Sequence, residues 1–531
     1  MIVDFLEHND GHKFQSDVCI VGSGAAGITI AKEFRNTNVS VVVLEAGGYT
    51  WEQGTQDIYT SEVVGLRHKG IHSGRARILG GTTTLWAGQT LPLDRIDFRQ
   101  RSWVADSGWP LARDDLEPYY RRAERTLHLS PIDYDVGRWP FPNPPLPSYD
   151  STKLRCLISQ FSPKADFAAA YCKELAATKN ITIVLHANVV KLRANVEASA
   201  LLGVEFRSLL GKTGRATARA YVVCCGGIET ARLLLASDDV EKYGLGNKYD
   251  IVGRYFQDHL QALLARVRLY NAESGLALFQ PFYWRGIAYS PKSALSEKIQ
   301  QERKTLNATV GVTGGEFVDE SSGVEAAKRV IRGVLRRKFI IPAGSDLRRM
   351  LGAPNEVLSA AFRRFIKHKP AFRMTGDTYV AVQCECEPNP SSQVALSAEL
   401  DQLGMPRARL DWRLTPMVRH TATIAVETFA QEMKRLEIGE VELDSFELPR
   451  RHDWDQLFWD TNHHIGTCRM SEDPHKGVVN RDCRLHTVKN LFINSSAVFP
   501  TSGHSNPTFT IIALGIRLAD HLKIVLESGS A

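Results

Sequence analysis

The apolar positions near the start of the chain follow two different patterns. A short run at 17–22, DVCIVG, leads into GSGAAG, and the ITIAKEFRN that follows spaces its apolar residues along one face of a helix. The continuous apolar run VSVVVLE comes next, which is typical of a strand buried in a parallel sheet. The pattern therefore predicts a strand, a glycine turn, a helix and a second strand within the first 48 residues.

Glycines and an acid occupy the places in this unit where a dinucleotide would bind. Gly22, Gly24 and Gly27 give the G-x-G-x-x-G spacing, which allows a tight turn, close approach of a pyrophosphate and close helix–strand packing. Glu45 ends the second strand, where a carboxylate accepts hydrogen bonds from the adenosine ribose. Because a carboxylate there disfavours a 2′-phosphate, the unit predicts FAD or NAD as the ligand.

Three later segments favour FAD over NAD. The segment 75–88, RARILGGTTTLWAG, offers backbone amides and hydroxyls that suit a pyrophosphate and the edge of an isoalloxazine. The segment 220–237, AYVVCCGGIETARLLLAS, predicts a second strand, turn and helix, and 490–521 predicts a strand, a proline-containing loop and a long helix. Taken alone, the first segment could be only a tight turn.

These motifs, with VGRYFQDH at 252–259 and NHHIGTCRM at 462–470, resemble the glucose–methanol–choline (GMC) family of FAD-dependent oxidoreductases. The resemblance runs from about residue 14 to 525, and Asn506 before Pro-Thr is similar to the sugar-oxidising branch that includes pyranose oxidase and glycoside 3-oxidases and dehydrogenases. It implies an α/β fold class, α+β overall. A Rossmann-like FAD-binding domain would join a substrate domain whose antiparallel sheet is covered by helices.

The FAD-binding motifs are scattered along the chain, so the predicted domains are discontinuous. The FAD-binding domain comprises 14–100, 185–260 and 465–531, and the substrate domain comprises 101–184 and 261–464. The Pro-rich stretch 135–150 is predicted to be a loop at the domain junction. CECEPNPSSQVALS and PRARLDWRL predict strands of the antiparallel sheet with a turn at Asn389-Pro390, and in the family this sheet lies above the flavin.

The resemblance also assigns roles to two side chains at the predicted active site. In the family motif H-x-x-G-[TS] the first histidine accepts the substrate proton, and counting back from Gly466-Thr467 gives His463. Alternation in an extended segment agrees, since only one of His463 and His464 can then face the flavin. Asn506 offers an amide to the alcohol oxygen at a helix N-terminus. His463 and Asn506 are the predicted catalytic residues.

Thirteen residues are predicted to bind the cofactor. They are Gly22, Gly24, Gly27, Glu45, Arg77, Gly80, Gly81, Thr84, Trp86, Val190, Gly227, Asn494 and Thr508. In pyranose oxidase a histidine before the tryptophan of the double-glycine loop carries the flavin covalently. Leu85 stands at that position, so non-covalent FAD is predicted.

Other histidines and cysteines near NHHIGTCRM leave alternatives open. Several lie within about 35 residues, but no CxxC or HExxH spacing is present, so no metal is predicted. His464 is predicted to be a packing or hydrogen-bonding neighbour, and Cys468 a packing residue. Asp258-His259 resembles a segment that sugar-oxidising relatives keep close to the substrate cavity, while a surface turn held by an Asp–His pair is an equal alternative.

Composition adds expectations about location and partners. With 43% hydrophobic and 23% charged residues, no signal-like N-terminus and no apolar run of about 18 residues, we expect a cytoplasmic protein. Its nine dispersed cysteines are expected to be buried and reduced. The net charge of +6 is mild, and nucleic-acid binding is not expected.

One segment is much more basic than the chain as a whole. The predicted basic helical insertion at 324–373 carries a charge of +10, so the remainder is net negative. Its two amphipathic stretches predict surface helices with solvated basic faces. A lid, a peripheral membrane contact or the docking of an acidic partner are the functional alternatives.

The predicted function is FAD-dependent oxidation of a secondary hydroxyl of a sugar or glycoside, at C2 or C3 of a pyranose, to a ketone. By the resemblance, hydride passes to flavin N5 while His463 accepts the proton, and O₂ or a quinone-like acceptor reoxidises the flavin. The alternatives are a GMC dehydrogenase of a non-sugar alcohol or polyol, an electron-transfer subunit docking through the basic segment, and a flavin-dependent lyase.

Overall fold

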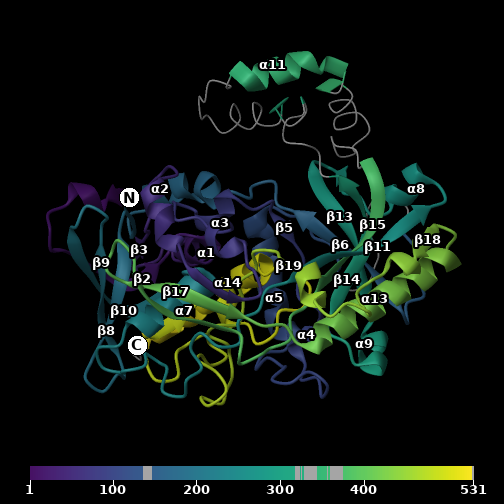
Figure 1. Cartoon of the computed structure of the whole chain (residues 1–531). Helices are drawn as coiled ribbons and strands as arrows, with labels where there is room; N and C mark the ends of the chain where they lie inside the picture. The colour runs from purple at the N-terminus through teal and green to yellow at the C-terminus, as the bar shows by residue number, and fades with distance from the viewer. Residues whose placement is uncertain are drawn as a thin grey trace.

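Two large sheets stand side by side in the structure, which is a computed structural model (Figure 1). It describes residues 1–134, 146–316, 323, 326–327, 344–355, 357–358 and 375–528. The first sheet, with β2, β3 and β8–β10, lies on the left of Figure 1, and the second, with β6, β11 and β13–β15, lies on the right. The predicted α/β class with an added antiparallel sheet is confirmed.

The first sheet is mainly parallel, as the continuous apolar runs predict. Its strands follow the order β1 (Ile2–Asp4), β7 (Ile181–Leu185), β3 (Val41–Leu44), β2 (His12–Val21), β10 (Thr213–Val223), β9 (Leu201–Arg207) and β8 (Asn188–Ala194), with β20 (Leu491–Ile493) beside β10. All four residues of β3 are buried, because helices cover a parallel sheet on both faces. Strands β8 and β9 form an antiparallel extension.

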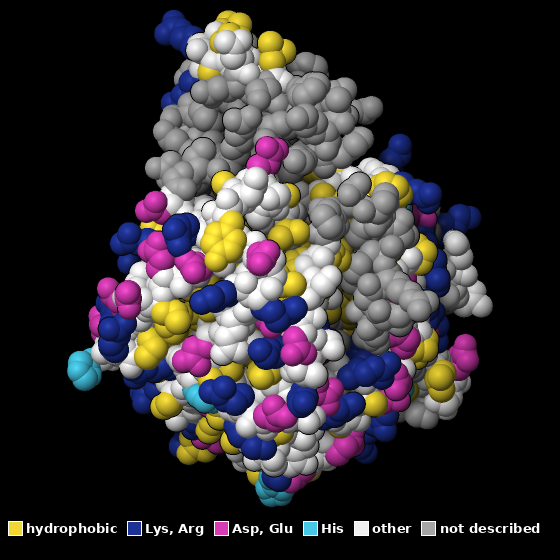
Figure 2. All heavy atoms as spheres, turned by 90° about the vertical axis from the view of Figure 1, so that its right-hand side faces the viewer, with side chains coloured by type: hydrophobic (Ala, Val, Ile, Leu, Met, Phe, Trp, Pro, Cys, Tyr) yellow, Lys and Arg dark blue, Asp and Glu magenta, His cyan; other side chains and the backbone are white. Residues whose placement is uncertain are grey.

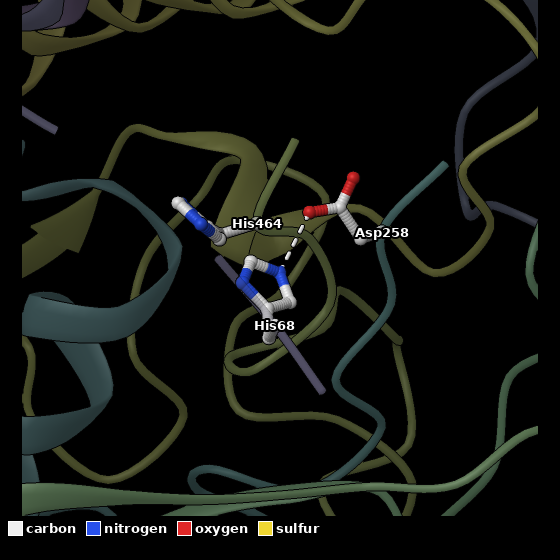
Figure 3. Close-up of side chains that lie close together, drawn as sticks. All are labelled: His68, Asp258 and His464. Carbon is white, nitrogen blue, oxygen red and sulfur yellow. Dashed lines mark hydrogen bonds and ion pairs between the residues drawn. The ribbon is translucent and has the colours of Figure 1, made fainter. Parts of the chain in front are cut away.

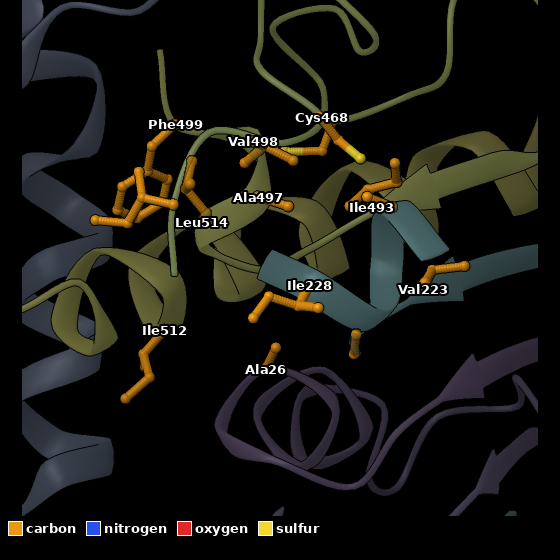
Figure 4. Packing of buried hydrophobic residues seen from close by; sticks show 14 of the residues in the cluster. Ala26, Val223, Ile228, Cys468, Ile493, Ala497, Val498, Phe499, Ile512 and Leu514 are labelled. Carbon is orange, nitrogen blue, oxygen red and sulfur yellow. The ribbon is translucent and has the colours of Figure 1, made fainter. Parts of the chain in front are cut away.

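Four helices complete this part of the molecule. They are α1 (Ala25–Glu33), α5 (Arg113–Leu127), α7 (Gly226–Ala236) and α14 (Thr508–Glu527). Helix α14 packs against α1 and α5, and its apolar residues Ile512 and Leu514 are fully buried. Figure 4 shows Ala26 of α1 and Ile228 of α7 within this packing, together with Val223 and Ile493 from two neighbouring strands.

The second sheet is antiparallel at every pairing between its described strands. Its order is β18 (Gly439–Glu442), β11 (Leu260–Leu269), β15 (Thr375–Cys384), β14 (Ala308–Glu316), β13 (Ile287–Leu295), β6 (Leu154–Phe161) and β5 (Gln89–Thr90), with β12 (Phe282–Trp284) beside β13 and β19 (Trp459–Asp460) beside β11. Helix α13 (Pro416–Arg435) packs on β14, β15 and β18. The prediction of an antiparallel sheet covered by a helix is confirmed.

A third sheet contains the strands β16 (Gln393–Leu400) and β17 (Pro406–Trp412), with β4 (Glu62–Gly65) parallel to β17. The predicted antiparallel pairing of β16 and β17 is confirmed. The predicted turn is present, because the Ser392 amide donates to the Asn389 carbonyl. However, this turn separates β15 from β16, which belong to different sheets, so β16 and β17 are not part of the large sheet.

The remaining helices are short. They are α2 (Gln53–Gln56), α3 (Gly70–Ser73), α4 (Arg95–Phe98), α6 (Lys173–Ala177), α8 (Ala272–Ala277), α9 (Glu297–Arg303) and α11 (Gly344–Gly352), with the single turns η1 (Phe5–Glu7), η2 (Asp57–Tyr59), η3 (Gly81–Thr84), η4 (Ala168–Cys172), η5 (Leu443–Ser445), η6 (Trp454–Leu457) and η7 (Ser496–Val498). Helix α11 belongs to the predicted basic insertion, most of which lies outside the described residues. So do residues 135–145 of the predicted Pro-rich loop.

Three strands depart from the predicted domain bounds. Strand β1 precedes residue 14 and β7 starts at Ile181, yet both lie in the first sheet. Strand β5 lies within the predicted range 14–100, yet it pairs with β6 in the second sheet. Short strands such as these are held by their neighbours and carry little pattern of their own.

The nine cysteines are free thiols, and seven of them are buried. Cys468 is fully buried, and Figure 4 shows it among apolar side chains that include Ala497 and Val498. The expectation of buried, unpaired cysteines is therefore confirmed. Burial raises the pKa of Cys468 to about 12, so its thiol is a packing group and not a nucleophile.

Figure 2 shows basic and acidic side chains interspersed over the described part of one face. None of the helices in the described ranges has both the length and the hydropathy of a membrane-spanning helix.

Candidate functional site

A cavity of about 640 Å³ lies at the carboxyl ends of the parallel strands. Val21 at the end of β2, Leu44 at the end of β3 and Cys224 just after β10 all border it. Ligands of open α/β sheets bind at this edge, and the volume lies within the roughly 300–1,000 Å³ of small-molecule and cofactor sites. The cavity is therefore the candidate functional site.

The first glycine turn forms one wall of this cavity. A Cβ on Gly27 would lie 1.9 Å from the Gly22 carbonyl oxygen, so only glycine lets α1 pack this closely. Gly24 borders the cavity, and a Cβ there would meet no atom within 4 Å among the described residues. No side chain caps the N-terminus of α1 at Gly24. Free backbone amides at an open helix N-terminus suit an anion such as a pyrophosphate.

Glu45 lies beside this turn and is almost fully buried. Its Oε2 accepts hydrogen bonds from the Ser23 amide (2.9 Å) and hydroxyl (2.6 Å), and its Oε1 accepts from the Gly47 amide (2.9 Å). A carboxylate offers about four acceptor positions, so one remains for a ribose hydroxyl. Burial raises the pKa of Glu45, and these hydrogen bonds oppose the shift.

Arginines provide positive charge near the same wall. Arg75 and Arg77 both border the cavity, and Arg75 donates to Glu229 of α7 at 2.8 Å. Burial alone would raise the pKa of Glu229, but Arg232, Arg75 and Arg77 together lower it to about 2. The ionised carboxylate thus holds three guanidinium groups at the edge of a site that would receive phosphates.

The second glycine turn lies directly against the first. Gly80 and Gly81 have φ of +91° and +55°, and a Cβ on Gly81 would lie 2.9 Å from the Gly24 Cα. Trp86 follows on the cavity border, and its indole N–H donates to the Ala165 carbonyl at 2.8 Å. The uncapped helix, the buried carboxylate and the close glycine turns together fit a dinucleotide such as FAD.

The structure places most of the predicted cofactor residues on the cavity border. Those on the border are Gly22, Gly24, Glu45, Arg77, Gly81, Trp86, Gly227 and Thr508, together with the predicted catalytic His463 and Asn506. The others, which the border does not include, are Gly27, Gly80, Thr84, Val190 and Asn494. Val190 is buried in β8, and its neighbour Val189 borders the cavity in its place. Gly27 instead acts through the close packing described above.

His463 borders the cavity on the side of the second sheet. Its backbone amide donates to both carboxylate oxygens of Asp258 at 3.0 Å, and its Nδ1 lies 2.8 Å from Thr461 Oγ1 and 2.8 Å from His259 Nδ1. Its Nε2 makes no hydrogen bond within the described ranges. Burial lowers the pKa of His463 to about 4, Asp258 opposes this, and Lys292 adds to it. The ring is therefore neutral near pH 7 and can accept a proton.

His464 also borders the cavity, which differs from the expectation that only one of the two residues would face it. The segment is not a regular strand, because Asn462 and Gly466 have φ of +65° and +89°. The two rings have different neighbours: His464 lies 5.2 Å from the ring of His68, and His463 packs on His259. Its predicted role as a packing neighbour stays a prediction.

Figure 3 shows His68, Asp258 and His464 close together, in a group whose potential ligand atoms lie within 4.8 Å of one another. His68 Nε2 donates to Asp258 Oδ2 at 2.9 Å, and His68 Nδ1 accepts from the Ile71 amide at 3.1 Å. Because an amide N–H can only donate, His68 is a neutral ring with both nitrogens engaged. A metal would have to displace one of these hydrogen bonds, so the geometry favours a hydrogen-bonded cluster.

Asn506 lies at the start of α14, next to Pro507 and Thr508, and borders the same cavity as His463. No side chain caps the N-terminus of α14. The Asn506 carboxamide makes no hydrogen bond with any described residue. Its amide and the positive end of the helix dipole are thus free to contact a substrate oxygen that carries developing negative charge.

Sequence reasoning missed several groups that build this site. Ser23 links the two glycine turns, because its hydroxyl donates to Glu45 and accepts from the Gly80 amide at 3.2 Å. Thr461 and Glu229 border the cavity as well. A signal in the sequence could have pointed to Glu229, because this acid lies in the first turn of the predicted helix after the second double glycine. Thr461 has no such signal.

The chain is similar to GMC oxidoreductases along much of its length. A family model described as GMC oxidoreductase matches the chain in two parts, at residues 151–261 and 388–515. Fructose dehydrogenase large subunit of Gluconobacter japonicus is 23% identical and covers 97% of this chain and 99% of its own length. Paromamine 6′-oxidase of Streptomyces fradiae is 24% identical, covering 96% and 93%. The 2-methyl-1,2-propanediol dehydrogenase of Mycolicibacterium austroafricanum is 24% identical, covering 96% and 95%.

Solved structures share the fold over nearly the whole chain. Formate oxidase of Aspergillus oryzae RIB40 has a TM-score of 0.57 at 19% identity and covers 98% of this chain and 100% of its own. Pyridoxine 4-oxidase from Mesorbium loti has a TM-score of 0.55 at 17% identity, covering 95% and 99%.

Proposed function

We propose that this chain, a member of the GMC oxidoreductase family, uses FAD to oxidise a secondary hydroxyl of a sugar or glycoside, at C2 or C3 of a pyranose, to the ketone. Members of the family are FAD-dependent oxidoreductases that act on CH–OH groups, and this chain is such an enzyme. The observation that carries the proposal is that His463, Asn506 and the dinucleotide turn border one cavity.

Each residue has a separate task in the reaction. Bound FAD supplies the hydride acceptor. His463 Nε2 accepts the hydroxyl proton, while Asp258 holds the backbone of His463 in place. The Asn506 amide donates to the substrate oxygen, and the N-terminus of α14 stabilises the negative charge that develops there.

Two observations support a sugar as the substrate. Gln89 borders the cavity, and its amide donates to the Ser159 hydroxyl of β6 at 2.7 Å, so the second sheet presents polar groups near the site. Hydroxyl-rich ligands need such donors and acceptors, since a buried hydroxyl without a partner is costly. The relatives with sugar-acting names, fructose dehydrogenase and paromamine 6′-oxidase, align along almost the whole chain.

Anaerobic mixing with a panel of substrates tests this function. We expect a pyranose or its glycoside to bleach the flavin absorbance of the holoenzyme, and the product to be the corresponding 2-keto or 3-keto sugar, identified by mass spectrometry and NMR. An aldehyde product, which would show that a primary hydroxyl had been oxidised, would contradict the proposed oxidation at C2 or C3. No bleaching with any sugar would contradict the substrate class.

A non-sugar diol or polyol is the second candidate. It is favoured by the near full-length alignment with 2-methyl-1,2-propanediol dehydrogenase. Including small diols in the same panel separates the two candidates.

The relatives include oxidases and dehydrogenases, and we propose O₂ or a quinone-like molecule as the electron acceptor. Turnover with O₂ compared with a dye acceptor decides between them.

We further propose that FAD is bound without a covalent bond. Leu85 borders the cavity at the position predicted from the sequence and has no nucleophilic atom. The neighbouring Cys225 is a poor nucleophile, because burial raises the pKa of its thiol to about 12. Acid precipitation should therefore release essentially all the FAD into the supernatant. A yellow, fluorescent pellet would contradict this prediction.

A further inference from the structure

His259 lies between the candidate base and the protein backbone. It directly precedes β11 and is fully buried. Its Nδ1 is 2.8 Å from Nδ1 of His463, and its Nε2 is 3.2 Å from the carbonyl oxygen of Ser502. The two rings meet edge to face, at an interplanar angle of 76°. Both nitrogens of His259 are therefore engaged, each with one partner in the described part of the chain.

These contacts determine where the ring protons lie. The Ser502 carbonyl can only accept, so Nε2 of His259 carries a proton and donates it. Burial, reinforced by the nearby His463, lowers the pKa of His259 to about 3, so the ring is neutral and Nδ1 carries a lone pair. The proton between the two Nδ1 atoms therefore belongs to His463. Thr461 Oγ1 lies 2.8 Å from the same Nδ1 and also accepts a hydrogen bond from its proton.

We propose that His259 is a positioning residue that holds His463 in the tautomer with its proton on Nδ1 and its lone pair on Nε2. This inference rests on the proposed function, in which Nε2 is the base. A neutral histidine in the other tautomer would present an N–H to the substrate hydroxyl and could not accept its proton. When Nε2 takes up the proton, the Nδ1–H bond to His259 remains and orients the imidazolium.

Asp258 and His259 divide the positioning of His463 between them. Asp258 accepts from the His463 amide and from the amide and hydroxyl of Thr461, so it fixes the backbone. The side chain of His259 instead contacts the ring of His463 and forms no hydrogen bond with its backbone among the described residues. The tautomer can therefore be altered at His259 without disturbing the backbone contacts of Asp258.

Two substitutions separate the tautomer effect from a structural one. His259→Leu removes one of the two acceptors at Nδ1 of His463 and leaves Thr461 Oγ1, whereas His259→Asn places an amide oxygen close to the original Nδ1. Both variants lose the hydrogen bond to Ser502, so their difference isolates the acceptor. With the true substrate under anaerobic conditions, we expect flavin reduction to slow about tenfold in His259→Leu and to return to within about threefold of wild type in His259→Asn, with substrate affinity little changed.

The tautomer itself is read without substrate. In holoenzyme labelled with ¹⁵N-histidine, the His463 signals are assigned by their loss in His463→Asn. We expect a protonated Nδ1 and an unprotonated Nε2 in wild type and in His259→Asn, and a population with the proton on Nε2 in His259→Leu. A proton on Nε2 in the wild type, or equal reduction rates for His259→Leu and wild type, would overturn the inference. The proposed function fails separately, if His463→Ala leaves the reduction rate unchanged.

Discussion

Alanine at position 463 is expected to slow flavin reduction by substrate by about 10²–10⁴-fold, the usual contribution of a general base. The substitution removes the only atom at the cavity border that we assign to accept the hydroxyl proton, Nε2 of His463. The neutral ring, kept neutral by burial, is competent before substrate arrives. Stopped-flow measurement of flavin bleaching at saturating substrate, without O₂, gives the rate directly.

Two further variants show whether this loss is chemical. His463→Asn retains an amide that can donate toward His259, but it has no nitrogen at the place of Nε2, so it should be as slow as alanine. His475→Ala changes an exposed histidine 12 positions further along the chain, and its flavin should be reduced by substrate at the wild-type rate. If substrate reduced the flavin of His463→Asn as fast as that of the wild type, the base would have to be another group.

The dinucleotide-binding unit could be predicted from the sequence because its geometry is local. Gly22, Gly24, Gly27 and Glu45 follow one another within a strand, a turn, a helix and a strand, and each element fixes the next. The family motif likewise identified His463 from its position three residues before Gly466, and the structure has His463 at the cavity border. These predictions needed no knowledge of distant contacts.

The surroundings of the base could not be predicted in this way. His259 and His463 lie 204 positions apart, and the two segments are brought together by long-range pairings, of Gln257 with Ile465 and of β11 with β19. Simple alternation also failed to separate His463 from His464, because Asn462 takes a left-handed conformation that no short pattern indicates. The choice of Val189 over Val190 at the cavity depends on the face of β8 that the sheet presents.

Leucine at position 24 is expected to weaken FAD binding by at least about 100-fold. The Cβ of Gly24 would enter open space at the cavity border, where a pyrophosphate would approach the N-terminus of α1. Losing two hydrogen bonds to charged phosphate oxygens, at about 1.5 kcal/mol each, costs about 3 kcal/mol and accounts for this factor. The measurement is the dissociation constant of FAD from the apoprotein, followed by flavin fluorescence, with the FAD content of the purified protein.

The conformation at Gly24 makes this a test of the site and not of the fold. Its φ is −74°, which any residue adopts, and a Cβ there meets no described atom, so the apoprotein should unfold at an unchanged temperature. Gly54→Leu is the matched control, because Gly54 is exposed in α2 and a Cβ there makes only ordinary contact with Leu209. Alanine at position 24 should lie between glycine and leucine. Wild-type FAD affinity in Gly24→Leu would place the phosphates elsewhere, since no pyrophosphate could approach the α1 amides past that side chain.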